Sequence, residues 1–343
     1  MSSPPRRVCI VKPSSLGDVV HALPTLAALR RLWPSAHLAW VVNAGLVGLL
    51  EGHPDLDEVI PFDRSRAGLG PRGLASASRF LVGLRRRHFD LAIDLQGLLR
   101  SSMMTLATGA RVRVGFADAR EGAARFYTSR VSTTASHAVD RLLAVARHLG
   151  APEAPARFVA AMTDEDRRWA RSTLGALGRP SLVVNLGARW TTKRWPPAQF
   201  AEVARRALAR GMAIVAVGAP EDRPLVDALR AALAPAEVLD LCGRTSLPRL
   251  AALAAEADVF LSNDTGPLHL AVAAGGNVVG IYTCTRPELT GPYVGTSVAS
   301  KIWCAGSCVK RCDRMECMVE LGADRVWDAV AGSLGVRMVV LSS

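Results

Sequence analysis

The chain of 343 residues has little aromatic content and no apolar run long enough to cross a bilayer. Aromatic side chains make up 5% of the sequence, with only three tyrosines. The basic residues are not interleaved with aromatics, so the pattern that stacks on nucleic-acid bases is missing. No Gly-x-Gly-x-x-Gly follows the first apolar run, which argues against a dinucleotide oxidoreductase. We therefore expect neither a membrane-spanning protein nor a nucleic-acid partner.

A signal-peptide core is also missing from the N-terminal region. The first apolar run, Val8 to Val11, is short and is broken by Lys12 and Pro13. These features predict a cytoplasmic protein.

Acidic residues are outnumbered, and the formal net charge is +12 with a pI near 10.1. Such an excess suits anionic partners, such as nucleotides, phosphorylated lipids or a membrane surface. A GC-rich genome that encodes arginine-rich proteins would produce the same excess of positive charge without any such partner. The segment Leu74 to Arg87 reads as a basic amphipathic helix, either a membrane contact or a solvated face.

Short apolar runs alternate with helical patterns along almost the whole chain. Strands are predicted at Val8 to Val11, Leu91 to Asp94 and Leu182 to Leu186, and one helix at Asp18 to Leu32. Repeated strand–helix units imply parallel sheets with right-handed crossovers. The fold class is α/β, with two Rossmann-like domains that are joined near residues 155–180 and face a central cleft.

The segment Ser262 to His269 lies between a predicted buried strand and a predicted helix. Ligands bind at this end of strands in open α/β sheets, and helix N-termini favour anions. Thr265 and Gly266 would present N–H groups to a phosphate, and Asp264 could hold sugar hydroxyls. His269 is as often a packed residue as a functional one in such a place.

Two further strand ends carry suitable groups. Lys193 lies in a loop rich in cations and hydroxyls, where it could neutralise a diphosphate; alternatively it is a solvated lysine beside a packing tryptophan. Glu221 could accept both hydroxyls of a ribose, or could only stabilise a helix dipole.

In the first half, Asp18 follows the first strand and a glycine turn. A carboxylate at this place can act as general base on an acceptor hydroxyl. It can equally be a helix-capping residue.

Five segments in order resemble the ADP-heptose–lipopolysaccharide heptosyltransferases of glycosyltransferase family 9. They are 12–18 (KPSSLGD), 94–97 (DLQG), 193–196 (KRWP), 218–221 (GAPE) and 263–269 (NDTGPLH). The resemblance implies a GT-B fold: an acceptor domain over 1–165, a nucleotide-sugar domain over 175–325, and a C-terminal segment, 326–343, that packs back on the first domain.

The resemblance also implies inverting sugar transfer without a metal or other cofactor. Asp18 matches the proposed base, Lys193 the diphosphate-contacting lysine and Glu221 the ribose-contacting glutamate. Asp264 matches an aspartate near the heptose hydroxyls, and His269 closes the motif in which Thr265 and Gly266 are the phosphate donors.

The implied donor is ADP-L-glycero-D-manno-heptose, and the implied acceptor is the Kdo or heptose of the lipid A-linked inner core. The implied location is peripheral, at the anionic cytoplasmic face of the inner membrane. The loop before Lys193 looks closer to the second heptosyltransferase type and the N-terminal segment closer to the first, so the acceptor stays open between them.

Four cysteines cluster near the C-terminus, Cys304, Cys308, Cys312 and Cys317, without regular paired spacing. They could bind zinc or iron in a structural role, or be reduced thiols near the surface. Two alternative functions remain at this point: another GT-B enzyme with a different nucleotide sugar, and a nucleotide- or metal-binding regulatory protein.

Overall fold

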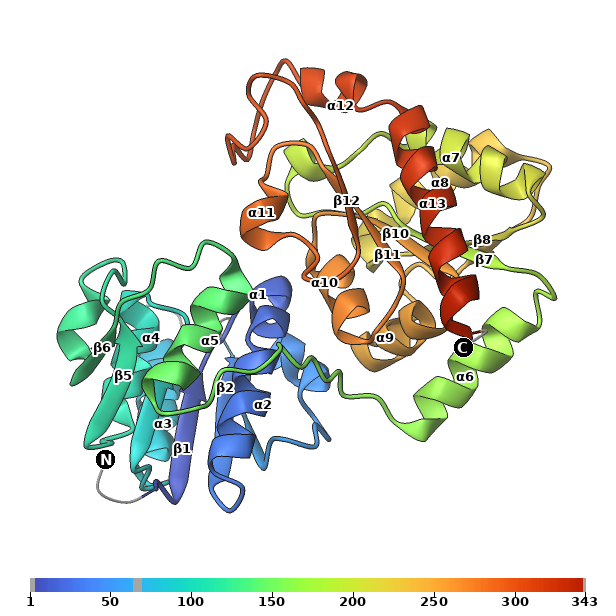
Figure 1. The fold of residues 1–343 in the computed structure, drawn as a ribbon. Coiled ribbons are helices and arrows are strands. Elements are labelled where there is room, and N and C mark those ends of the chain that lie inside the picture. Colours follow the sequence, from blue (N-terminus) through green and yellow to red (C-terminus); the bar gives the residue numbers. More distant parts are fainter. Residues whose placement is uncertain (1–3, 64–69, 342–343) are drawn as a thin grey trace. The chain divides into compact units, whose positions relative to one another are not determined.

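Each half of the chain builds its own six-stranded parallel sheet (Figure 1). The structure is a computed structural model that describes residues 4–63 and 70–341. It divides into two units, Met1–Ala161 and Met162–Ser343. The predicted α/β class with two Rossmann-like sheets is confirmed.

The sheet of the first unit has the strand order β3-β2-β1-β4-β5-β6. Its strands are β1 (Arg7–Val11), β2 (His37–Asn43), β3 (Glu58–Phe62), β4 (Leu91–Asp94), β5 (Val112–Phe116) and β6 (Ser129–Val131). Helices cover both faces, which is why the central strands are continuous apolar runs. Val11 at the end of β1 pairs in register with Asp94 at the end of β4.

Five α-helices of the described residues flank this sheet. They are α1 (Leu16–His21), α2 (Leu23–Leu32), α3 (Pro71–Arg85), α4 (Leu99–Ala107) and α5 (Ala138–His148). Helices α1, α2 and α5 pack together on one face. On the other face Leu84 of α3 and Met104 of α4 pack on Cys9 and Ala92 of the sheet.

The second unit repeats this order as β12-β11-β10-β7-β8-β9. Its strands are β7 (Ser181–Asn185), β8 (Ala213–Val217), β9 (Val238–Asp240), β10 (Val259–Asn263), β11 (Val278–Tyr282) and β12 (Thr296–Ala299). Its longer helices are α6 (Asp164–Gly175), α7 (Pro197–Ala209), α8 (Arg223–Leu233), α9 (Leu247–Glu256), α10 (Gly266–Ala273) and α13 (Ala323–Leu341). The short helices α11 (Pro287–Thr290) and α12 (Glu316–Glu320) lie in the C-terminal part.

Helix α13 packs on α7 and on β10, β11 and β12. Val326, Trp327 and Val330 are buried in the same core as Leu182 and Ile214. The first part of the expected C-terminal segment 326–343 therefore belongs to the core of the second unit.

One predicted helix is two helices in the structure. The segment Asp18 to Leu32 is interrupted at Ala22, between α1 and α2. Pro24 explains the break, because it has no N–H to continue the ladder of helical hydrogen bonds. Among the described residues, no helix combines the length and the apolar composition that crossing a bilayer requires.

Candidate active site

The candidate site of the second unit lies where its strand order reverses. Strands β7 and β10 are neighbours, and Asn185 pairs in register with Ser262 near their carboxyl ends. Chain segments that leave these two ends in opposite directions open a crevice between them, which is where α/β sheets bind ligands. The loop after β7 carries Lys193, and the loop after β10 carries Asp264.

Lys193 and Asp264 form an ion pair in this crevice. The Nζ atom of Lys193 lies 2.5 Å from Oδ2 of Asp264. The lysine is also a cation–π partner of Trp190, with Nζ 4.8 Å from the ring centroid. The two predicted site residues are therefore brought together, although they are 71 positions apart in the sequence.

Asp264 is buried, with 3% of its surface exposed. Its Oδ2 also accepts a hydrogen bond from Thr285 Oγ1 at 2.6 Å, and Oδ1 lies 3.5 Å from Nε2 of His269. Burial alone would raise the pKa of Asp264, but the hydrogen bond from His269 and the charge of Lys193 outweigh it and hold the pKa far below its usual value. The carboxylate is therefore ionised, and Oδ1 keeps the capacity to accept from a ligand hydroxyl.

Thr265 and Gly266 begin helix α10 beside this pair. Thr265 is the N-cap residue, Pro267 follows Gly266, and Leu268 makes the first backbone bond back to Thr265 at 3.0 Å. The N–H groups of Thr265 and Gly266 thus precede the first helical hydrogen bond, and Pro267 has no N–H. Donors in this position, at the positive end of a helix dipole, suit an anion.

Asn263 holds the two loops in register, a role that sequence reasoning missed. Its Oδ1 accepts from the N–H of Trp195 at 3.1 Å, and its Nδ2 donates to the carbonyl of Leu186 at 2.8 Å. Trp195 is buried and donates through Nε1 to the carbonyl of Leu321 at 2.7 Å. The lysine loop is therefore fixed at both of its ends.

The segment 308–310, which follows β12, also contacts the loop that carries Lys193. Thr192 Oγ1 donates to the carbonyl of Val309 at 2.7 Å, and the N–H of Cys308 donates to the carbonyl of Cys284 at 2.8 Å. Lys310 lies over the same Trp190 ring as Lys193, with Nζ 5.3 Å from the centroid. Trp190, Thr285 and Lys310 are site residues that the sequence analysis did not select.

Glu221 lies apart from this cluster. It is exposed in the turn Pro220–Asp222 that follows β8. Among the described residues no hydrogen bond or ion pair joins it to Lys193 or Asp264. Glu221 has in common with Lys193 and Asp264 only that all three follow the carboxyl ends of strands of the second sheet.

The four clustered cysteines are free thiols in the structure. In the described part of the chain no group of three or more His, Cys, Asp or Glu side chains is placed to hold a metal ion. Cys308 is exposed, Cys317 is buried, and Cys304 and Cys312 are intermediate. Metal binding by these cysteines stays a prediction.

In the first unit, Asp18 lies in the first turn of helix α1 and completes the capping box of its N-cap residue, Ser15. Its Oδ2 accepts from both the N–H and the Oγ of Ser15, at 2.8 Å each. Burial acts to raise its pKa, but the charge of Lys12 and the bonds from Ser15 outweigh it, so the pKa is lowered. Asp18 is thus an ionised carboxylate at the carboxyl end of β1, as a general base requires, and a capping residue as well.

Lys12 stands beside Asp18 at the point where this sheet reverses its strand order, between β1 and β4. It is buried, with 6% exposed, which lowers its pKa, while the charges of Asp18 and Asp94 act in the opposite direction. Asp94 is fully buried and accepts from Tyr127 Oη at 2.7 Å and from the N–H of Gln96 at 2.8 Å. Lys12 is a further candidate site residue, because it places a positive charge next to the predicted base.

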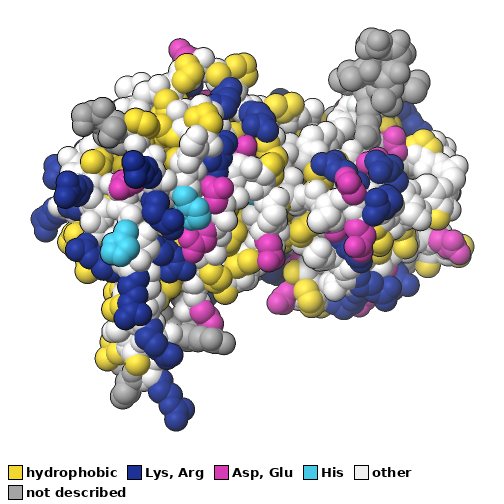
Figure 2. All heavy atoms as spheres, turned by 90° about the horizontal axis from the view of Figure 1, so that it is seen from below, with side chains coloured by type: hydrophobic (Ala, Val, Ile, Leu, Met, Phe, Trp, Pro, Cys, Tyr) yellow, Lys and Arg dark blue, Asp and Glu magenta, His cyan; other side chains and the backbone are white. Residues whose placement is uncertain are grey.

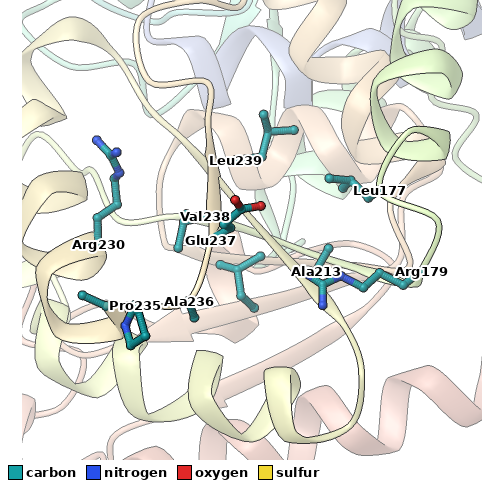
Figure 3. Close-up of a pocket in the computed structure, with 11 residues that line it drawn as sticks. Leu177, Arg179, Ala213, Arg230, Pro235, Ala236, Glu237, Val238 and Leu239 are labelled. Atoms are coloured by element: carbon teal, nitrogen blue, oxygen red, sulfur yellow. The ribbon is translucent and has the colours of Figure 1, made fainter.

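A pocket of about 540 Å³ lies at the opposite edge of the second sheet (Figure 3). Ala213 and Val238, at the amino ends of β8 and β9, line it together with Arg179, Arg230 and Glu237. Because Lys193 and Asp264 are at the carboxyl ends, this pocket is separate from the candidate site.

Two Rossmann-like units, each with a six-stranded parallel sheet, are the architecture of the GT-B fold. The chain matches the model of Glycosyltransferase family 9 (heptosyltransferase) over residues 78–319, and it belongs to this family. Membership identifies it as an enzyme, a glycosyltransferase, and confirms the resemblance noted from the five segments.

Similar proteins of known name agree with this assignment. The chain is 34% identical to lipopolysaccharide heptosyltransferase 1 of Pseudomonas aeruginosa, over 89% of this chain and 87% of that one. It is 29% identical to the lipopolysaccharide core heptosyltransferase OpsX of Haemophilus influenzae, over 84% and 82%. Among solved structures, the E. coli heptosyltransferase WaaC with ADP matches at a TM-score of 0.78 and 25% identity, over 95% of this chain and 99% of that one.

Proposed function

We propose that this enzyme moves heptose from ADP-L-glycero-D-manno-heptose to a Kdo or heptose of the lipopolysaccharide inner core. The names of the relatives support the acceptor class. WaaC, which has been solved with ADP and with ADP-2-deoxy-2-fluoro heptose, supports the donor. The observation that carries the proposal is the cluster of Lys193, Asp264 and the start of α10 at the reversal of strand order.

In this proposal the second unit binds the donor. Lys193 and the N–H groups of Thr265 and Gly266 neutralise the diphosphate as it leaves. Asp264 fixes the lysine through its ion pair and offers Oδ1 to a hydroxyl of the transferred sugar. His269 supports Asp264, and Glu221 accepts from the ribose hydroxyls.

Asp18 supplies the base. Its carboxylate takes the proton of the acceptor hydroxyl while that oxygen attacks the anomeric carbon and the carbon–oxygen bond to the diphosphate breaks. Attack opposite the leaving group inverts the configuration at this carbon. The leaving charge is held by Lys193 and backbone N–H groups, so the step is expected to proceed without a metal.

The acceptor is anchored in a bilayer by lipid A. The enzyme is therefore expected to act on the cytoplasmic face of the inner membrane, at an anionic surface. Its net charge of +12 supports this setting.

The test measures sugar transfer by mass spectrometry and ADP binding by calorimetry. Asp18→Asn is expected to lower turnover by about 10²–10⁴-fold with ADP affinity unchanged. Asp166→Asn is the matched control, because Asp166 caps α6 through Thr163 in the same way as Asp18 caps α1 through Ser15. Normal turnover by the Asp18 variant, or equal loss in the control, would refute the base.

The same assay tests the donor and the metal. ADP is expected to compete with the donor and UDP is not, and a chelator is expected to leave the rate unchanged. Preference for UDP would point instead to a GT-B enzyme with another nucleotide sugar.

A further inference from the structure

Helices α3 and α4 expose an unusual number of large apolar side chains. Ten such side chains are exposed among the described residues, and five of them are on these two helices. They are Leu74 and Val82 on α3, with 58% and 50% exposed, and Leu99, Met103 and Leu106 on α4, with 43%, 42% and 39%. Both helices cover the same face of the first sheet, so these side chains point away from the core on one surface.

The two helices themselves carry arginine and no acidic residue. Residues 70–89 contain five arginines and no aspartate or glutamate, and residues 95–117 contain three and again none. Figure 2 shows Lys and Arg side chains gathered at the left of the view, on the first unit, with apolar side chains between them. We call the following exposed residues the α3–α4 surface: Arg72, Arg79, Arg85, Arg86, Arg100, Leu74, Val82, Leu99, Met103 and Leu106.

Among the described residues, the arginines of the α3–α4 surface form no ion pair. Arg87, just after α3, pairs with Glu58 at 2.7 Å and so belongs to the structure of the unit. No described carboxylate lies within ion-pair distance of the surface arginines. Glu121 is near α4, but it accepts from the backbone N–H of Leu99 at 3.1 Å.

A cationic pocket continues this surface beyond the ends of the two helices. It has a volume of about 720 Å³ and is lined by Arg6, Arg85 and Arg111. One carboxylate, Asp90, also lines it, but Oδ2 of that group accepts from the N–H groups of Arg6 and Arg7 at 2.8 and 2.9 Å. The guanidinium groups of Arg6, Arg85 and Arg111 form no ion pair with a described carboxylate and can bind an anion.

We propose that the α3–α4 surface docks on an anionic lipid bilayer. The leucine, valine and methionine side chains enter the interface between head groups and acyl chains, and the arginines bind lipid phosphates. The pocket beside Arg85 and Arg111 takes a lipid head group. Charge complementarity selects this occupant, since exposed apolar residues on the same two helices as arginines without a described ion-pair partner match a negatively charged bilayer.

A nucleic acid fits the surface less well. It would need aromatic side chains on which bases can stack. The aromatics of this region face inward: Phe80 packs on Phe62 with 5.1 Å between ring centroids, and Phe89 is buried.

The inference does not depend on which sugar is transferred, and its test is independent of the donor. Flotation measures binding of the full chain to phosphatidylcholine vesicles with and without phosphatidylglycerol. The triple variant Arg72→Gln/Arg79→Gln/Arg86→Gln is expected to bind the anionic vesicles roughly a hundredfold more weakly, at about fivefold for each arginine. Leu99→Ser/Met103→Ser is expected to weaken binding at every salt concentration.

The matched control is Arg168→Gln/Arg171→Gln/Arg179→Gln, which removes the same charge from exposed positions of the second unit. It is expected to bind like the wild type. Equal losses in the two triple variants would overturn the proposal. So would release of the protein from vesicles by duplex DNA at a lower concentration than inorganic phosphate needs for the same release.

A transfer assay with an acyl-free acceptor separates this inference from the proposed function. The α3–α4 triple variant is expected to keep full activity there, and Asp18→Asn is expected to lose activity while still binding vesicles. Vesicle binding by Asp18→Asn at the wild-type level thus supports docking even if the proposed reaction is wrong.

Discussion

Replacing Lys193 by methionine is expected to destabilise the second unit. The change leaves the Asp264 carboxylate, whose side chain is 4% exposed, buried without its cation. Removing one partner of a buried pair typically costs 3–5 kcal/mol; Lys193 is 19% exposed and Thr285 and His269 remain, so we expect about 2–3 kcal/mol. For a unit of this size the melting temperature should fall by roughly 5–12 °C.

The pH dependence gives the sign of the effect. In the wild type the lowered pKa of Asp264 contributes stability that is present above its unfolded-state pKa and is lost as pH falls through the folded-state value. Without Lys193, one of the two residues that lower this pKa is lost, so the pKa rises above its wild-type value. The variant should therefore show its full loss in free energy of unfolding at neutral pH. This loss should become smaller in acid, because the Asp264 carboxyl group of the variant then takes up a proton.

Urea unfolding followed by hydrogen exchange in β10 and α10 measures the loss in the second unit itself, which matters because two units need not unfold together. Lys193→Arg, which keeps the cation, is the control. Adding Asp264→Asn to Lys193→Met should recover much of the lost stability, because no buried charge is then left unpaired. A single variant as stable as the wild type, or a double variant less stable than the single one, would refute this account of the site.

Two further changes test the first unit. Lys12→Met removes a charge that lowers the pKa of Asp18, so the acid limb of the kcat/KM profile should move to higher pH. An unchanged acid limb would show that Lys12 does not set the pKa of the proposed base. Gly115→Ala would place a Cβ 2.4 Å from the Tyr127 ring and push its hydroxyl from Asp94. Thermal unfolding should show a loss of about 1–3 kcal/mol; no loss would mean that the ring can move freely.

Sequence reasoning placed the central strands well, because a parallel strand buried on both faces is a continuous apolar run. Strand β4 was predicted with its observed bounds, Leu91–Asp94. The edge strands β6 and β12 were missed, since Ser129–Val131 and Thr296–Ala299 are short and polar and have no such signal.

The candidate site was predictable only where its residues lie in recognisable strand-end segments. Lys193 and Asp264 were selected in this way, and the structure pairs them. Thr285 and Lys310 were not, because each comes from a loop whose local sequence has no ligand-binding pattern and reaches the site only through tertiary contacts. Burial of the Asp264 carboxylate is likewise a property of packing that spacing cannot reveal.

The hydrogen bonds that fix the lysine loop span most of the second unit. Thr192 bonds to Val309 across 117 positions, and Trp195 bonds to Leu321 across 126. A ribosome therefore completes β7 and its loop long before it supplies the residues that hold this loop in place. The lysine loop therefore does not have both of these hydrogen bonds until Leu321 has been synthesised.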